Sequence, residues 1–214
     1  MTDLCILIPA KPFQEAKTRL SPVLSPQQRV LLSRYLLKRT IHIAQQVSEV
    51  VVISRSQAVR QLAKQAGAWS LVEFGTDLNR ALQQGLRWIE AQGGQSVLIL
   101  PADLPHLQTE PLWQIIALGK TIPALVVAPC QRGEGTNALF LRPLGLIEPQ
   151  FGLNSFTRHQ QAAHHAGIEP IIINHPALAF DIDIPIDLEQ ARYVMREIEL
   201  KLCQANNPSI LLQS

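Results

Sequence analysis

One stretch of the chain, residues 97–105, has the sequence Val-Leu-Ile-Leu-Pro-Ala-Asp-Leu-Pro. Its four consecutive apolar residues, with two glycines before them and Pro101 after them, predict a strand buried on both faces of an α/β sheet. Asp103 would then lie just beyond the carboxyl end of this strand, at the edge where open α/β sheets bind ligands. A carboxylate there can hold a cation that bridges nucleotide phosphates. The alternative is a turn aspartate that accepts hydrogen bonds from its own loop.

The composition favours a globular protein with a large core. Of the 214 residues, 47% are hydrophobic and 17% are charged, and we predict one domain over residues 1–200 and a C-terminal tail over residues 201–214. The 19 Lys and Arg against 17 Asp and Glu leave a net charge of +2, too small for a nucleic-acid-binding surface. The 3 cysteines show no metal or disulfide spacing, and no apolar run reaches the roughly 18 residues of a membrane helix. We therefore expect a cytoplasmic protein that binds neither nucleic acid nor membrane.

Apolar runs and helix signals alternate along the chain. Strands are expected over residues 4–8, 50–53, 97–100, 124–128 and 138–141. One helix is expected over residues 57–65, and others are expected to follow the N-caps Ser25, Asp77, Thr109, Ser155 and Asp187. This alternation predicts an α/β fold with a mostly parallel sheet and helices on both faces.

Basic residues cluster directly after the first expected strand. Lys11, Lys17 and Arg19 lie within one loop, where their charges could neutralise a triphosphate and a departing pyrophosphate. Charges in a loop are also commonly just solvated. Further on, Asn79 lies in the first turn of a helix and could pair with the edge of a base, although a surface position explains it equally well.

Two aspartates alternate with apolar residues near the end of the domain. In an extended segment Asp181 and Asp183 would point to one side while Phe180 and Ile182 face the other. Two carboxylates on one side repel each other unless a cation or a proton lies between them. Together with Asp103 they would form an all-oxygen site suited to Mg²⁺, although a solvated strand end would show the same pattern.

Two glycine-containing stretches could bind an anion. Residues 132–139 include Thr136, and residues 151–159 include Gly152 and Ser155. Glycines let backbone amides approach an anion closely, whereas a hairpin turn or a simple helix cap would use similar residues. His159 and its neighbouring histidines lack further ligands at zinc-binding spacing, so we expect solvated or capping residues.

Taken together, these motifs resemble the CofC/FbiD guanylyltransferases of coenzyme F420 biosynthesis. The resemblance covers about residues 4–195 and rests on Pro9-Ala-Lys-Pro, Asp77-Leu-Asn-Arg-Ala, Leu100-Pro-Ala-Asp-Leu-Pro, Gly135-Thr-Asn-Ala, Phe151-Gly and Asp181-Ile-Asp-Ile-Pro. It implies a three-layer α/β/α sandwich of the nucleotide-diphospho-sugar transferase type, with a mostly parallel mixed sheet. Members of this family transfer GMP from GTP to a small phosphorylated three-carbon acid and release pyrophosphate.

The resemblance also implies a role for each candidate residue. It assigns Mg²⁺ to Asp103, Asp181 and Asp183, and the acceptor to Thr136, Gly152 and Ser155. It directs Lys11, Lys17 and Arg19 toward the GTP phosphates, with Lys17, Arg19 and Asp103 acting in catalysis, and Asn79 toward guanine.

The acceptor and some alternatives stay open. Phosphoenolpyruvate is favoured over 2-phospho-L-lactate and 3-phospho-D-glycerate, but this chain has Phe151-Gly-Leu-Asn-Ser where members often have Phe-Gly-Pro-Gly-Ser. A molybdenum-cofactor guanylyltransferase would usually carry Gly-Gly-x-Ser where this chain has Pro9-Ala-Lys-Pro. A non-catalytic nucleotide-binding sensor is the alternative from another class. The sequence also leaves open a homodimer and coupling to the downstream F420-pathway transferase.

Overall fold

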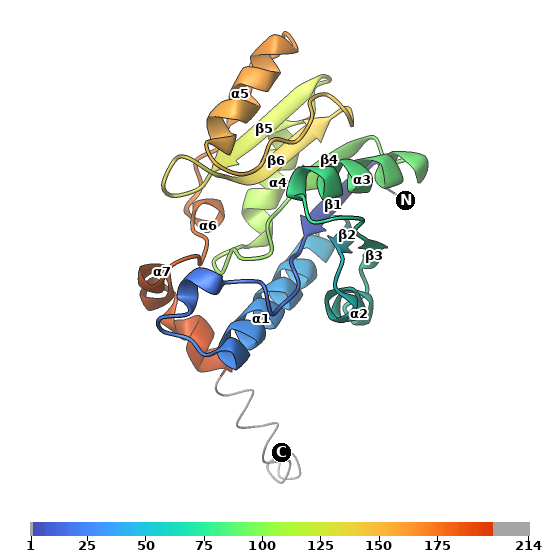
Figure 1. Ribbon diagram of the computed structural model, residues 1–214. Coiled ribbons are helices and arrows are strands. Elements are labelled where there is room, and N and C mark those ends of the chain that lie inside the picture. The colour runs from blue at the N-terminus through green and yellow to red at the C-terminus, as the bar shows by residue number, and fades with distance from the viewer. Residues whose placement is uncertain (1, 199–214) are drawn as a thin grey trace, which may run out of the picture.

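A seven-stranded sheet forms the centre of the computed structural model, which describes residues 2–198 (Figure 1). The strand order is β3-β2-β1-β4-β6-β5-β7. The strands are β1 (Leu4–Pro9), β2 (Glu49–Ser54), β3 (Trp69–Val72), β4 (Ser96–Ile99), β5 (Ala124–Pro129), β6 (Thr136–Arg142) and β7 (Ile171–Ile172). The five expected strands are confirmed, and β3 and β7 are additional. The expected tail over residues 201–214 lies outside the described residues.

The strand directions confirm a mostly parallel, mixed sheet. β1 pairs in parallel with β2 and β4, β2 with β3, and β5 with β7. β6 runs antiparallel between β4 and β5. Because of this reversal, the first residue of β6, Thr136, lies at the same edge of the sheet as the carboxyl ends of the other strands.

Helices connect most of the strands. The elements within residues 2–198 are η1 (Thr18–Leu20, a 3₁₀ turn), α1 (Pro26–Gln45), α2 (Gln57–Gln65), α3 (Leu78–Ala91), α4 (Thr109–Leu118), α5 (Ser155–His165), α6 (Pro176–Ala179) and α7 (Pro185–Gln190). Residues 192–198 are also helical. None of the described helices is both long enough and apolar enough to cross a bilayer.

The expected helix starts are confirmed in part. Ser25 forms a capping box with Gln28, and the Asp77 carboxylate accepts from the backbone amide of Arg80 at 2.8 Å. The expectations for Thr109, Ser155 and Asp187 are wrong. Each of these residues lies inside its helix, because the extended or left-handed residue that serves as N-cap comes earlier in the chain: Gln108, Asn154 and Ile184.

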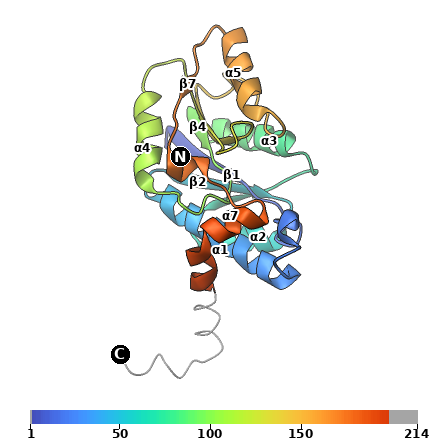
Figure 2. The ribbon, with the colours of Figure 1, turned by 90° about the vertical axis from the view of Figure 1, so that its left-hand side faces the viewer.

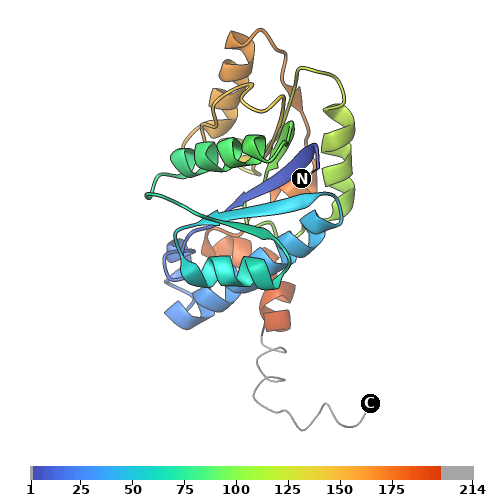
Figure 3. The same cartoon turned by 90° about the vertical axis from the view of Figure 1, so that its right-hand side faces the viewer.

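The helices cover both faces of the sheet, as expected. One apolar cluster joins Leu98 and Leu100 to α1, α2 and α4, and a second joins Val97 and Ile99 to α3 and α5. Figures 2 and 3 show α4 on one side of the strands and α3 and α5 on the other. The run at 97–100 is therefore buried on both faces, and the fold is a three-layer α/β/α sandwich.

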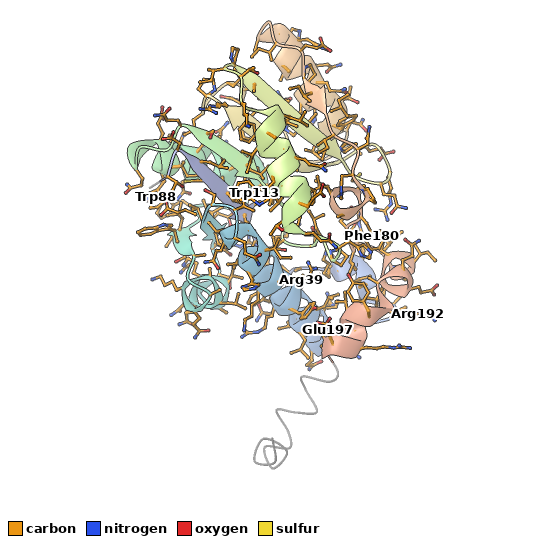
Figure 4. The ribbon with its side chains drawn as sticks, turned by 180° about the vertical axis from the view of Figure 1, so that it is seen from behind. Arg39, Trp88, Trp113, Phe180, Arg192 and Glu197 are labelled. Carbon is orange, nitrogen blue, oxygen red and sulfur yellow. The ribbon has the colours of Figure 1, made fainter. Side chains whose placement is uncertain are left out.

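A third, smaller cluster holds the segment that carries the paired aspartates. Phe180 and Ile182 pack with Leu20, Leu36 and Val194, and Figure 4 labels Phe180 near the helices at the end of the described chain. Burial of each such side chain contributes roughly 1.5–3 kcal/mol. The alternation predicted for residues 180–183 is confirmed, since Phe180 and Ile182 are buried and both aspartates are partly exposed.

Candidate active site

A pocket of about 470 Å³ lies at the carboxyl edge of the sheet. The ends of β1, β2 and β4 contribute Pro9, Ile53 and Ile99 to its lining. Among the predicted site residues, those that line it are Lys11, Lys17, Asp103 and Asp183. Those that do not line it are Arg19, Asn79, Thr136, Gly152, Ser155 and Asp181.

Lys17 and Asp103 form an ion pair in the pocket. The Lys17 ammonium donates to Asp103 Oδ2 at 2.6 Å and also to the carbonyl of Ile182. Its side chain is only 8% exposed, and its backbone is left-handed with φ 56°. From the sequence we expected Lys17 to bind the phosphates and Asp103 to bind a metal ion. In the structure the two side chains form an ion pair with each other.

The loop that carries Asp103 is held by two other parts of the chain. Arg39 of α1, labelled in Figure 4, donates to the carbonyl of Leu107 at 2.9 Å. The backbone amide of Ile182 donates to the carbonyl of Asp103 at 3.3 Å. These bonds fix the main chain around Asp103 relative to α1 and to the 181–183 segment.

The two aspartates of that segment have different surroundings. Asp183 Oδ2 accepts from Arg19 at 2.6 Å, and this pair is more exposed than the Lys17 pair. Asp181 Oδ1 accepts from the Asn137 amide at 3.2 Å. Burial and the nearby negative charge of Asp103 raise the pKa of Asp181. Within residues 2–198, no three acidic, His or Cys side chains are already arranged around a common metal position.

An ion pair between the buried Asp187 and the exposed Arg132 was missed by sequence reasoning. Asp187 lies in the first turn of α7 and accepts from the backbone amides of Asp183 and Ile184, each at 2.8 Å. It also accepts from Arg132 at 2.9 and 3.0 Å. Burial opposes ionisation, but the two amides and Arg132 outweigh it and lower the pKa of Asp187. Asp187 therefore orients the backbone of Asp183. The sequence signal that could have predicted this role is a carboxylate three residues after the N-cap Ile184, the position at which a side chain binds the N-cap amide.

Thr136 is bound by a buried histidine. His159 is fully buried and its Nδ1 lies 2.9 Å from Thr136 Oγ1, while its Nε2 accepts from the backbone amide of Gln150 at 2.9 Å. Burial and the charge of Arg158 lower the pKa of His159 to about 4. A neutral ring that accepts at Nε2 carries its proton on Nδ1, so His159 donates to Thr136 and leaves the hydroxyl proton free for another acceptor. The expectation of a solvated or capping histidine is wrong for His159.

Asn79 binds the neighbouring loop through both atoms of its side-chain amide. Its Nδ2 donates to the carbonyl of Phe151 at 3.1 Å, and its Oδ1 accepts from the amide of Phe151 at 2.7 Å. Phe151 lines the pocket, and its ring lies edge-on to His159 with the ring centres 5.0 Å apart. Asn79 of α3 and His159 of α5 thus position the same loop.

The loop around Gly152 has a left-handed backbone at Asn154, where family members often have glycine. Gly152 has φ 117°, and Asn154 has a left-handed backbone with φ 53°. Asparagine is one of the few residues that adopt this conformation readily. Ser155, the first residue of α5, is buried. The departure from the family pattern at residues 153–154 is therefore compatible with a tight turn before α5.

Comparison with known proteins identifies the family. A family model described as "Guanylyl transferase CofC like" matches residues 4–194, which is most of the chain. The chain belongs to the CofC-like guanylyl transferase family. This CofC-like chain is therefore a nucleotidyltransferase, and the resemblance inferred from its motifs is confirmed.

Individual relatives of this CofC-like chain have related names. The phosphoenolpyruvate guanylyltransferase of Rubrobacter xylanophilus is 36% identical over 184 residues, covering 85% of this chain and 90% of the relative. The 3-phospho-D-glycerate guanylyltransferase of Colwellia psychrerythraea is 33% identical over 187 residues, covering 86% and 89%.

The fold of the CofC-like chain also matches a solved structure. A putative nucleotide-diphospho-sugar transferase from Desulfovibrio desulfuricans has a TM-score of 0.75, with 95% of this chain and 98% of that chain covered. Its sequence identity is 14%, so this likeness concerns the fold alone. The expected sandwich of the nucleotide-diphospho-sugar transferase type is confirmed.

Proposed function

We propose that this protein transfers GMP from GTP to a small phosphorylated three-carbon acid, with release of pyrophosphate, in coenzyme F420 biosynthesis. Phosphoenolpyruvate is the favoured acceptor, followed by 2-phospho-L-lactate and 3-phospho-D-glycerate. The family match over residues 4–194 supports the reaction class. The relative with 36% identity, named for phosphoenolpyruvate, supports the first choice of acceptor.

One observation in the structure carries the proposal. Lys11, Lys17, Asp103 and Asp183 line a single pocket at the carboxyl edge of the sheet. The pocket therefore combines cations that can neutralise phosphates with carboxylates that can hold a metal ion. A pocket that only bound a neutral metabolite would have little need for both.

The reaction needs charge neutralisation more than a protein base. An oxygen of the acceptor's phosphate forms a bond to the α-phosphorus of GTP, and the bond from that phosphorus to the bridging oxygen of the pyrophosphate breaks. The attacking phosphate is already an anion near neutral pH. We assign Lys17 and Arg19 to hold the negative charge on the two reacting groups, and Lys11 to the triphosphate.

We propose Mg²⁺ as the cofactor, held by Asp103 and Asp181 with Asp183. These carboxylates are the hard oxygen donors that Mg²⁺ prefers, and no described cationic side chain forms an ion pair with Asp181. Burial and the repulsion from Asp103 raise the pKa of Asp181, and a divalent cation near Asp103 would relieve that repulsion. Mg²⁺ would supply additional positive charge to the phosphates. Lys17 would exchange its bond to Asp103 for one to the substrate.

The acceptor is proposed to bind beside the loop at residue 151. Thr136 has a hydroxyl proton available, because its oxygen already accepts from His159. Gly152 and Ser155 belong to the turn that leads into α5, where backbone amides and the helix amino terminus favour an anion. We therefore assign the acceptor's carboxylate or phosphate to Thr136, Gly152 and Ser155.

The test is pyrophosphate release from GTP with each of the three acceptors, with and without the downstream transferase of the F420 pathway. Release should require Mg²⁺ and be abolished by EDTA. Asp103→Asn serves as the inactive control. A folded protein that releases no pyrophosphate with any acceptor, in either setting, would overturn the proposal in favour of a nucleotide-binding sensor. We further propose a cytoplasmic location, where GTP is available, while a homodimer and coupling to the downstream transferase stay predictions.

A further inference from the structure

The position of Asn79 leaves the recognition of guanine unexplained. Both polar atoms of its side-chain amide bind the backbone of Phe151, and Asn79 does not line the pocket. The edge of the amide that presents a donor and an acceptor side by side is occupied by Phe151, and the N–H and the lone pair that remain point apart and cannot meet a base as a pair. Another group must therefore distinguish guanine from other bases, if GTP is the substrate proposed above.

The pocket has two chemically different ends. Lys17 and Asp103 follow β1 and β4, where the phosphates are proposed to react. Arg55 and Glu73 follow β2 and β3 and also line the pocket. The strand order places β3 two strands from β1 and three from β4, or about 10 and 15 Å at the usual strand spacing. A nucleotide whose phosphates bind near Lys17 can place its base at the β2 and β3 end.

Among the acidic residues that line the pocket, Glu73 differs from the other three. Those three form ion pairs: Glu15 with Arg55, Asp103 with Lys17, and Asp183 with Arg19. Glu73 forms no ion pair with any residue in the described part of the chain. Its carboxylate is nevertheless held in place. Its Oε2 accepts from the backbone amide of Arg55 at 3.1 Å, and its own amide donates to the carbonyl of Ser54 at 3.2 Å.

A fixed carboxylate with unused acceptor capacity suits one base in particular. Guanine presents two adjacent donors, N1–H and the N2 amino group, to which a carboxylate can accept two hydrogen bonds. Adenine and cytosine each present an acceptor nitrogen next to their amino group, and a carboxylate would repel it. Uracil has a single donor between two acceptors. The negative charge of Glu73 therefore favours guanine and disfavours the other three bases.

We propose that Glu73 is the residue that selects guanine, by accepting hydrogen bonds from N1–H and the N2 amino group. The inference rests on the proposed use of GTP and goes further by naming the group that determines base specificity. Glu15 does not fill this role, because the guanidinium of Arg55 already neutralises its charge.

The experiment compares GTP with ITP, which lacks the N2 amino group, and with ATP. We would measure kcat/KM from pyrophosphate release for the wild type, Glu73→Gln and Glu15→Gln. Glu73→Gln keeps an oxygen for the amide of Arg55 but loses the charge and presents an amino group to guanine. It should lower kcat/KM for GTP by about 10- to 100-fold and bring the GTP to ITP ratio close to 1. Glu15→Gln should leave that ratio unchanged.

Binding measurements separate this inference from the proposed reaction. Equilibrium binding of GTP and ITP to the wild type and to Glu73→Gln needs no acceptor and no turnover. If no acceptor supports turnover but the wild type binds GTP more tightly than ITP and Glu73→Gln does not, the role of Glu73 stands and the proposed reaction fails. Two results would overturn the role of Glu73. One is a wild type that binds GTP and ITP with equal affinity, and the other is a ratio of GTP to ITP affinity that is the same in the wild type and in Glu73→Gln. Circular dichroism and thermal unfolding would establish that the variants are folded.

Discussion

The Lys17 ammonium lies 2.6 Å from Asp103 Oδ2, although the two residues are 86 positions apart in the chain. Lys17 also donates to the carbonyl of Ile182, so one cation joins the loop after β1 to the loop after β4 and to the segment with the paired aspartates. This ammonium neutralises the carboxylate that we assign to the metal. Binding of GTP and Mg²⁺ would then exchange one set of charge pairs for another, with the ammonium moving to the phosphates and the metal ion to the carboxylate.

The first prediction concerns Asp103. Asp103→Asn removes the negative charge but keeps an oxygen that can accept from Lys17. We expect kcat/KM for GMP transfer to fall by about 10³-fold, while the free energy of unfolding changes by only about 1 kcal/mol. Asp77→Asn is the matched control, because asparagine caps a helix as well as aspartate does, and it should leave both quantities near wild type. Turnover that survives in Asp103→Asn would refute the metal assignment.

The second prediction concerns the left-handed backbone of Lys17. Lys17→Ala and Lys17→Gly should both lose most turnover, since both remove the ammonium. Lys17→Gly should be the more stable of the two by about 1 kcal/mol, because glycine adopts φ 56° without the strain that the Cβ of alanine causes. The same pair of substitutions at the exposed helical residue Lys38 should show the opposite order. Urea unfolding of the four variants measures both differences, and an alanine variant at 17 as stable as the glycine variant would contradict the prediction.

The third prediction separates two roles for Asn79. Asn79→Ala removes both bonds to the backbone of Phe151 and should loosen the loop beside the acceptor. We expect the KM for the acceptor to rise about tenfold while the KM for GTP changes little. Steady-state kinetics with each substrate varied in turn distinguishes this result from a role in guanine binding, which would raise the KM for GTP instead.

The fourth prediction concerns pH. The pKa of His159 is lowered to about 4 from its ordinary value of 6.5, so below pH 6.5 the unfolded chain takes up a proton that the folded chain does not. The free energy of unfolding should therefore fall as the pH is lowered from 6.5 toward 4, by about 2–3 kcal/mol from this group. Urea unfolding at several pH values should show this slope in the wild type and a flatter one in His159→Gln.

The matched control for this prediction is His164→Gln. His164 lies on the same helix, α5, but its side chain is 54% exposed. Its replacement should flatten the slope less than His159→Gln does, because water still reaches this side chain. An equal slope in the wild type and in His159→Gln would show that the buried ring does not contribute.

Much of the fold could be predicted because its signals are local. The apolar run at 97–100, the capping box of Ser25 and the alternation at residues 180–183 each involve residues that are neighbours in the chain. The strands β3 and β7 were missed because their local sequences carry no such apolar signal. Their residues are exposed or partly exposed, so these edge strands lack the long apolar run that marked the buried ones.

The candidate residues were found by type and by position at strand ends, but their partners were not. Lys17 pairs with Asp103, Arg19 with Asp183, Asn79 with Phe151 and His159 with Thr136. Each of these contacts joins segments that are far apart in sequence, and a side chain of the same type could have remained in solvent. Glu73 carried no motif of its own, and Asp187 was recognised only as a helix cap, because its ion pair with Arg132 joins segments that are distant in sequence.

Sequence alone thus established most of the order of strands and helices, the burial of the central strand and the set of charged residues at one edge of the sheet. These properties follow from backbone preferences and from the hydrophobic effect acting on runs of neighbouring residues. The pairing of each charge, the neutral state of His159 and the position of Glu73 in the pocket depend on distances and burial across the assembled sheet. Electrostatic interactions are set by those distances and by the exclusion of water, so they become defined only when the chain has folded.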